Sequence, residues 1–210
     1  MNIVILAAGA SSRMGQHKLL LEIHGQTLLQ RAVQTALTVS PNVLVVLGRD
    51  AEKVQASLQN QPVQFVTNPL YMQGMETSFA TAVKVLEARA SIFMLADMPF
   101  VDVGMLLALQ TTFFGNSLLG ETQIIPSHRT NTRFAATDEL PLIVASRYGS
   151  VIAPPHLFSS GLLPLLGEIG AKPTIQKNLE RTVFLEWQEE KLFDVDTPED
   201  LARLEQDLEF

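Results

Sequence analysis

The chain has 210 residues, of which 47% are hydrophobic and 18% charged, with a net charge of −7 and no cysteine. This length suits one folded domain, so we expect a single domain over residues 1–210. The acidic balance argues against a nucleic-acid partner, and the lack of cysteine excludes disulfides, thiolate zinc sites and a cysteine nucleophile. No apolar run reaches the roughly 18 to 20 residues of a membrane span. Residues 1–4 lack the basic region of a signal peptide, so we expect a cytoplasmic protein with no membrane partner.

Strand-like and helix-like segments alternate along the chain. Short runs of apolar and β-branched residues predict strands at 2–7, 43–47, 63–67, 91–95, 122–126, 141–146 and 181–186. Amphipathic spacing predicts helices near 27–39, 50–59, 75–89, 102–112, 155–166 and 197–208. Because such alternation produces right-handed βαβ units, the predicted fold class is α/β. We expect a three-layer α/β/α sandwich with a mainly parallel, Rossmann-like sheet.

The predicted fold indicates where a ligand would bind. Ligands of parallel sheets bind beside the carboxyl ends of the strands. The loops after Leu6, Val66, Leu95 and Trp187 should therefore lie along one edge. The stretch 114–141 is polar and irregular, and three interpretations stand for it: a lid, an excursion of strands, or a partner contact.

The first predicted strand leads into the loop AAGASSRMG at residues 7–15, and Lys18 follows. Backbone N–H groups of such a loop can surround an anion, while Arg13 and Lys18 supply a guanidinium and an ammonium. With His17 they would form a positive island in an acidic chain. The spacing fits neither a Walker A loop nor a dinucleotide fingerprint, and a plain strand-to-helix turn is the alternative. We predict a nucleotide-phosphate loop. Its predicted nucleotide contacts are Ala7, Ala8, Gly9, Ser11, Ser12, Arg13 and Lys18.

Asp97 follows an apolar strand and precedes Met98 and Pro99. A carboxylate at a strand end that faces a triphosphate is a suitable Mg²⁺ ligand, because magnesium prefers one or two carboxylates plus phosphate oxygens. The alternative is a turn or helix-capping role, although Asp102 is better placed to cap the next helix. We therefore predict that Asp97 binds metal.

Two acidic residues precede the last predicted helix. Thr197 is a predicted N-cap, with proline next and an acid at the third helical position, so Glu199 and Asp200 are expected to serve the helix start. Asp194 and Asp196 lie on the same side of an extended segment, and both are candidates for the site.

These motifs resemble those of the molybdenum-cofactor nucleotidyltransferases. The run LAAGASSRMG at 6–15 with KLLL at 18–21 is similar to the pattern LAAGxSxRMGxxKLL of the cytidylyltransferase branch. The guanylyltransferase branch usually has a second glycine where this chain has Ala8. The segments GMETS at 74–78, ADMP at 96–99 and DVDTPEDL at 194–201 follow in the family's order. The resemblance implies a fold like that of the nucleotide-diphospho-sugar transferases.

The resemblance also implies roles for particular residues. In the family the turn at 74–78 faces the nucleobase, so Gly74, Thr77 and Ser78 become predicted nucleotide contacts, although hydroxyls in a first turn usually just satisfy the helix end. Related cytidylyltransferases that act on sugar acids share the ending VDTPEDL, whose first aspartate binds metal. That residue is Asp196 here, so Asp97 and Asp196 are the predicted metal ligands.

The activity implied is Mg²⁺-dependent transfer of CMP from CTP to the terminal phosphate of molybdopterin, with Arg13, Lys18 and Asp97 as catalytic residues. A molybdoenzyme or its chaperone would receive the product. The alternatives are transfer from GTP, a sugar-phosphate or methylerythritol-phosphate acceptor, and a non-catalytic protein that binds or delivers molybdenum cofactor. The segment 148–158 departs from the G-x-P-x-L-F pattern of many relatives, and this departure concerns the acceptor.

Overall fold

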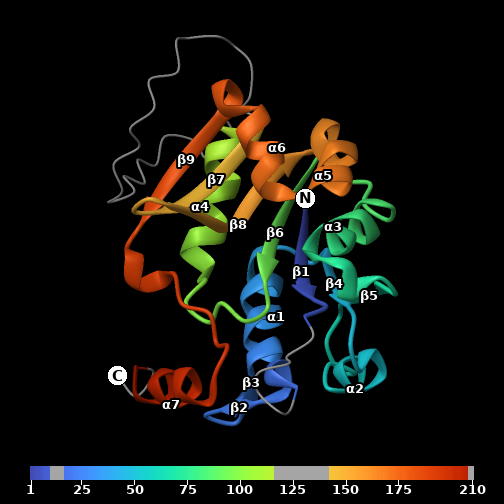
Figure 1. Ribbon diagram of the computed structural model, residues 1–210, viewed down its shortest axis with the longest axis vertical. Helices are drawn as coiled ribbons and strands as arrows, with labels where there is room; N and C mark the ends of the chain where they lie inside the picture. Colours follow the sequence, from blue (N-terminus) through green and yellow to red (C-terminus); the bar gives the residue numbers. More distant parts are fainter. Residues whose placement is uncertain (10–16, 116–141, 208–210) are drawn as a thin grey trace.

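The computed structural model describes residues 1–9, 17–115 and 142–207 and alternates strands with helices, as predicted (Figure 1). The strands are β1 (Asn2–Ala7), β2 (Glu22–Ile23), β3 (Gln26–Thr27), β4 (Val43–Leu47), β5 (Gln64–Thr67), β6 (Ala90–Leu95), β7 (Ile143–Tyr148), β8 (Val151–Ser159) and β9 (Thr182–Trp187). The helices are α1 (Leu28–Val39), α2 (Ala51–Ala56), α3 (Met75–Val83), α4 (Val103–Phe114), α5 (Leu163–Ile169), α6 (Ala171–Lys177) and α7 (Pro198–Asp207). Short 3₁₀ helices cover Lys18–Leu20, Tyr71–Gln73, Ser160–Leu162, Leu179–Arg181 and Glu189–Lys191. The predicted strand at 122–126 lies outside the described residues, as does most of the stretch 114–141.

Seven of the described strands form one sheet, in the order β5-β4-β1-β6-β8-β7-β9. Strands β1, β4, β5 and β6 run parallel, and β7 runs parallel to β9. Strand β8 lies between β6 and β7 and is antiparallel to both, so six of the seven strands point the same way. Strands β1 and β4 are continuous apolar runs because helices cover both of their faces.

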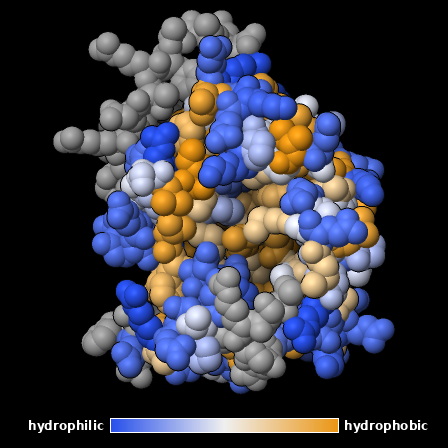
Figure 2. Space-filling model, in the orientation of Figure 1, coloured by the Kyte–Doolittle hydropathy of each residue, from blue (hydrophilic) through white to orange (hydrophobic). Residues whose placement is uncertain are grey.

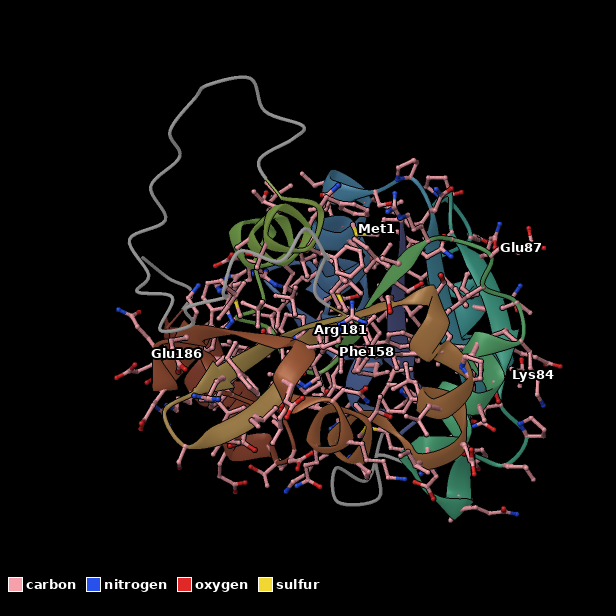
Figure 3. The ribbon with its side chains drawn as sticks, turned by 90° about the horizontal axis from the view of Figure 1, so that it is seen from above. Met1, Lys84, Glu87, Phe158, Arg181 and Glu186 are labelled. Carbon is pink, nitrogen blue, oxygen red and sulfur yellow. The ribbon has the colours of Figure 1, made fainter. Side chains whose placement is uncertain are left out.

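Helices cover both faces of this sheet, which confirms the predicted three-layer arrangement. Buried side chains of α1, α2 and α4 form one core with one face of the strands. Those of α3, α5 and α6 form a second core on the opposite face, with Phe79, Phe93 and Phe158 in contact at its centre. Seen from above, Phe158 lies well inside the molecule, whereas Lys84, Glu87 and Glu186 lie at its periphery (Figure 3).

Local sequence signals explain where two of these helices begin. Thr27 and Gln30 form a capping box at the start of α1: Thr27 Oγ1 accepts from Gln30 N at 3.1 Å, and Gln30 Oε1 accepts from Thr27 N at 2.9 Å. Asp102 caps α4 by accepting from Met105 N at 2.9 Å, which confirms its predicted role. None of the described helices is long and apolar enough to cross a membrane.

The predicted helix at 155–166 is wrong over its first half. Residues up to Ser159 continue strand β8, and helix α5 begins only at Leu163. Pro154 and Pro155, joined by a cis peptide bond, both lie inside the strand. His156, Leu157 and Phe158 are instead buried between β6 and β7, so pairing with neighbouring strands outweighed the local signal. Helix α3 also ends at Val83 rather than near 89, and β2, β3 and α6 were not predicted.

The last helix lies apart from the sheet, against the hairpin of β2 and β3 (Figure 1). Leu204 of α7 packs with Ile23, Leu28 and Val195 in a small third core. The segment that leads into α7 is held to the end of β6 by a hydrogen bond from Val195 N to the carbonyl oxygen of Asp97, at 3.1 Å. The fold thereby brings the chain around residue 196 back to the end of the central strands.

Candidate active site

The loops predicted after Leu6, Val66, Leu95 and Trp187 leave the same edge of the sheet, because β1, β5, β6 and β9 all point the same way. Asn68 N donates to Leu47 O at 2.7 Å, and Ala96 N donates to Leu6 O at 3.2 Å, so the loops after β1, β4, β5 and β6 leave the sheet at the same level. Figure 2 shows the surface hollowed near the middle of the view, with hydrophobic side chains along the walls.

Lys18, Asp97 and Asp196 meet at this edge from three distant parts of the chain. Lys18 Nζ lies 2.5 Å from Asp97 Oδ2 and 2.7 Å from Asp196 Oδ1. The Lys18 side chain is 10% exposed, against 21% for Asp97 and 45% for Asp196. The lysine is thus the most buried side chain of the three.

The electrostatics of this cluster differ from a simple positive island. Burial alone would lower the pKa of Lys18, but the charges and hydrogen bonds of Asp97 and Asp196 outweigh burial and raise it. Burial lowers the pKa of His17, whose Nε2 lies 3.2 Å from Arg49 O. The lowered pKa disfavours the charged form of His17, against the expectation that it adds positive charge here. The Lys18 charge is compensated by two carboxylates.

A third acid borders the cluster. Asp194 keeps part of its surface exposed, yet crowding by protein atoms, followed by the negative charges of Asp97 and Asp196, raises its pKa to about 6. A carboxyl group with this pKa is only partly protonated near neutral pH and adds negative potential beside the cluster.

Thr197 and Asp200 fix the start of α7 and, with it, the position of Asp196. Asp200 Oδ2 accepts from Thr197 N at 2.8 Å and from Asp196 N at 3.1 Å, while Thr197 Oγ1 accepts from Asp200 N at 3.2 Å. Hydrogen bonds from Thr197 lower the pKa of Asp200. These contacts confirm the predicted capping arrangement.

Because Thr197 is a cap rather than a ligand, Thr197→Ala should cost about 1 kcal/mol of unfolding free energy, the usual value of a lost N-cap. Enzymatic turnover should stay close to that of the wild type. Urea unfolding and a turnover assay on the same preparation would measure both. A large loss of turnover without loss of stability would contradict the purely structural role.

At the start of α3, the predicted nucleotide contacts Thr77 and Ser78 are held by a residue that the sequence reading missed. Asn68 is 1% exposed, and its Nδ2 donates to Thr77 Oγ1 at 2.8 Å and to Ser78 Oγ at 3.0 Å. Its Oδ1 accepts from Leu70 N at 2.9 Å. Gly74 has a φ of +130°, which side-chain-bearing residues rarely adopt, and precedes the first turn of α3. Asn68 thus ties the end of β5 to this turn.

Gly48 is a second residue that the sequence reading missed. A Cβ atom at position 48 would lie 2.5 Å from Ala8 O and 2.8 Å from the Ala8 side chain, so only glycine fits. Ala7 and Ala8 are buried, at 1% and 6% exposure, whereas Gly9 is exposed. The start of the predicted phosphate loop is therefore packed directly against the end of β4. The predicted contacts Ser11, Ser12 and Arg13 lie outside the described residues.

The donor set at Asp97 and Asp196 fits a magnesium ion that arrives with phosphate ligands. Among residues 1–9, 17–115 and 142–207, no group of three or more His, Cys, Asp or Glu side chains is arranged to hold a metal ion. The two carboxylates nevertheless converge on one cation, the Lys18 ammonium. Magnesium commonly uses one or two carboxylates and completes its shell with waters and phosphate oxygens.

Comparison with known proteins identifies the family. The model of the MobA-like NTP transferase domain matches residues 3–188. The molybdenum cofactor cytidylyltransferase of Escherichia coli is 29% identical over 126 residues, which are 60% of this chain and 66% of that protein. A probable molybdenum cofactor guanylyltransferase of Synechococcus elongatus is 36% identical over 107 residues, 50% of this chain and 54% of that protein. The match thus spans about half to two thirds of these curated relatives.

Two further likenesses cover nearly the whole chain. The nicotine blue oxidoreductase of Paenarthrobacter nicotinovorans is 27% identical over 210 residues, 96% of this chain and 94% of that protein. A nucleotidyl transferase structure from Methanothermobacter has a TM-score of 0.74 at 20% identity and covers 98% of this chain and 96% of that one. This likeness confirms the predicted fold of the nucleotide-diphospho-sugar transferases. By its sequence match over residues 3–188, the chain belongs to the family of MobA-like NTP transferase domains.

Proposed function

We propose that residues 1–210 act as a single Mg²⁺-dependent nucleotidyltransferase domain that transfers CMP from CTP to the terminal phosphate of molybdopterin. The observation that carries this proposal is the meeting of Lys18 with Asp97 and Asp196 at the carboxyl edge of the sheet, beside the loop that follows β1. An ammonium and two carboxylates at this place suit a metal–triphosphate complex, since the first can bind phosphate oxygens and the others a cation.

The proposed reaction is an in-line displacement at phosphorus. An oxygen of the acceptor phosphate attacks the α-phosphorus of CTP, a new P–O bond forms, the bond to the β-phosphate oxygen breaks, and pyrophosphate leaves with the electron pair. Backbone N–H groups of residues 8–15, with Arg13 and Lys18, would hold the β- and γ-phosphates and offset the charge of the leaving group. Asp97 and Asp196 would hold Mg²⁺, which supplies charge neutralisation at the triphosphate.

Other functions make different predictions in one assay. The chain would be incubated with Mg²⁺, molybdopterin and each of CTP, GTP, ATP and UTP, while pyrophosphate release is followed. We expect pyrophosphate to be released from CTP, and this release should require molybdopterin. Release with a sugar phosphate or methylerythritol phosphate instead would identify another acceptor, and binding of molybdenum cofactor without release would identify a delivery protein. The same preparation would be tested for reduction or oxidation of nicotine blue, because one relative of nearly full length is named a nicotine blue oxidoreductase.

We expect kcat/KM to be higher for CTP than for GTP. A pocket that hydrogen-bonds one base leaves its buried polar groups unpaired with the wrong one, which can cost several kcal/mol. Ala8 has the alanine of the cytidylyltransferase-like pattern, and its methyl group fills the contact with Gly48. Ala8→Gly would loosen this contact and make room for a purine, so it should narrow the CTP preference without inverting it. A wild-type preference for GTP would overturn the assignment of the base but not of the reaction.

A further inference from the structure

The Lys18 ammonium lies where both carboxylates of the proposed metal site converge. Its Nζ is 2.5 Å from Asp97 Oδ2 and 2.7 Å from Asp196 Oδ1, and its side chain is 10% exposed. The backbone around it is also fixed: Leu20 N donates to His17 O at 2.9 Å, Leu21 N donates to Lys18 O at 3.1 Å, and Leu19 is buried. Lys18 is thus held in the cluster by its charge and by its place at the start of a 3₁₀ helix.

We propose that Lys18 makes metal binding at Asp97 and Asp196 conditional on a polyphosphate, so that the site rejects a free divalent cation and accepts one that arrives with a nucleotide. This inference rests on the proposed function. Two oxygens that hold Nζ at 2.5 and 2.7 Å leave no room for a second cation between them, because Mg²⁺ takes its oxygen ligands at about 2.1 Å. The ammonium and the metal are therefore alternative occupants of one place.

A polyphosphate can change the occupant because it offers the ammonium new partners. The lysine side chain is a flexible four-carbon stem with three donors, so Nζ can leave the carboxylates for phosphate oxygens while the backbone stays in place. The same polyphosphate brings the further oxygen ligands that two carboxylates alone do not provide. Without it, a metal would have to displace a buried ammonium from two charge-assisted hydrogen bonds and leave that charge unpaired.

The test measures binding of Mn²⁺, a stand-in for Mg²⁺, by equilibrium dialysis with the same concentration of tripolyphosphate on both sides of the membrane, so that only Mn²⁺ bound by the protein is retained in excess. Wild-type protein should bind Mn²⁺ weakly alone and strongly when inorganic tripolyphosphate is added. Lys18→Met keeps the apolar stem but removes the charge, leaving two carboxylates whose mutual repulsion a divalent cation relieves. This variant should bind Mn²⁺ about tenfold more tightly or better than wild type in the absence of polyphosphate.

Two controls separate the local effect from a general change in charge. Lys53→Met removes an ammonium whose side chain is 76% exposed and lies outside the cluster, and should leave Mn²⁺ binding unchanged. Adding Asp196→Asn to Lys18→Met should abolish the gain, and circular dichroism would show that each variant is folded. Lysine-independent binding, with wild type and Lys18→Met equal in the absence of polyphosphate, would overturn the inference and leave the proposed reaction standing. No Mn²⁺ binding by any variant, even with tripolyphosphate, would overturn both the inference and the metal assignment of the proposed function.

Discussion

Asp97→Asn should lower kcat for nucleotidyl transfer by roughly a hundredfold or more, the scale observed when one preorganised electrostatic stabiliser is lost. The variant keeps the size of the side chain but removes the negative charge that would hold a metal against the triphosphate. Its fold should survive, because the contact of residue 97 with the C-terminal segment is made by its backbone carbonyl, which accepts from Val195 N. Steady-state kinetics over a range of Mg²⁺ concentrations would measure the loss, and Asp196→Asn should act in the same direction.

Asp102→Asn is the matched control for this prediction. Asp102 follows the same strand a few residues later, but it caps α4 and pairs with Lys191 outside the cluster. Asparagine is also a good N-cap, so turnover of Asp102→Asn should remain near that of the wild type. Equal turnover in Asp97→Asn and Asp102→Asn, with an unchanged requirement for Mg²⁺, would show that Asp97 has no metal role.

The parallel half of the fold could be predicted because its signals are local. Strands β1, β4 and β6 are apolar runs that fit only a sheet covered on both faces, and the capping residues Thr27 and Asp102 mark the helices that follow. Strand β8 could not be predicted in the same way. Its two prolines and short apolar run fit the start of a helix as well as a strand. Only its insertion between β6 and β7 decides in favour of the strand.

The site was predictable as a set of residues but not as an arrangement. Asp97 is noticeable because a carboxylate directly after a buried strand cannot join the core, and Lys18 because it follows a glycine-bearing loop. That Lys18 and Asp196, 178 positions apart, share a hydrogen bond depends on the path of the whole chain. Asn68 was missed because an asparagine before a proline indicates an ordinary turn. Its burial and its bonds to Thr77 and Ser78 exist only in the folded molecule.

The stability of the protein should fall on acidification because of one buried histidine. His156 of β8 is 3% exposed, and its Nδ1 accepts from Ser146 N at 3.1 Å. Burial lowers the pKa of His156 from its ordinary 6.5 to about 3, since a charged ring would be poorly solvated there. Between these two pKa values, His156 therefore binds a proton in the unfolded chain but not in the folded chain. Stability is complete above pH 6.5 and declines as the pH falls toward 3, by roughly 2 to 3 kcal/mol between pH 7.5 and 4.5.

The variant His156→Asn isolates this effect. Its side-chain oxygen can still accept from Ser146 N, but it does not titrate, so the variant should be less stable at pH 7.5 through lost packing and yet lose less stability on acidification. The dependence of stability on pH has to be compared between variants because Asp194 acts in the opposite direction. Its pKa of about 6 in the folded chain lies above the ordinary 3.8, so its protonation favours the folded state at low pH. His24→Asn makes the same replacement at an exposed position and serves as the control. Urea unfolding of wild type and the two variants at pH 7.5, 6.0 and 4.5 would measure how the free energy of unfolding depends on pH. Parallel pH profiles for wild type and His156→Asn would mean that His156 is not the group responsible.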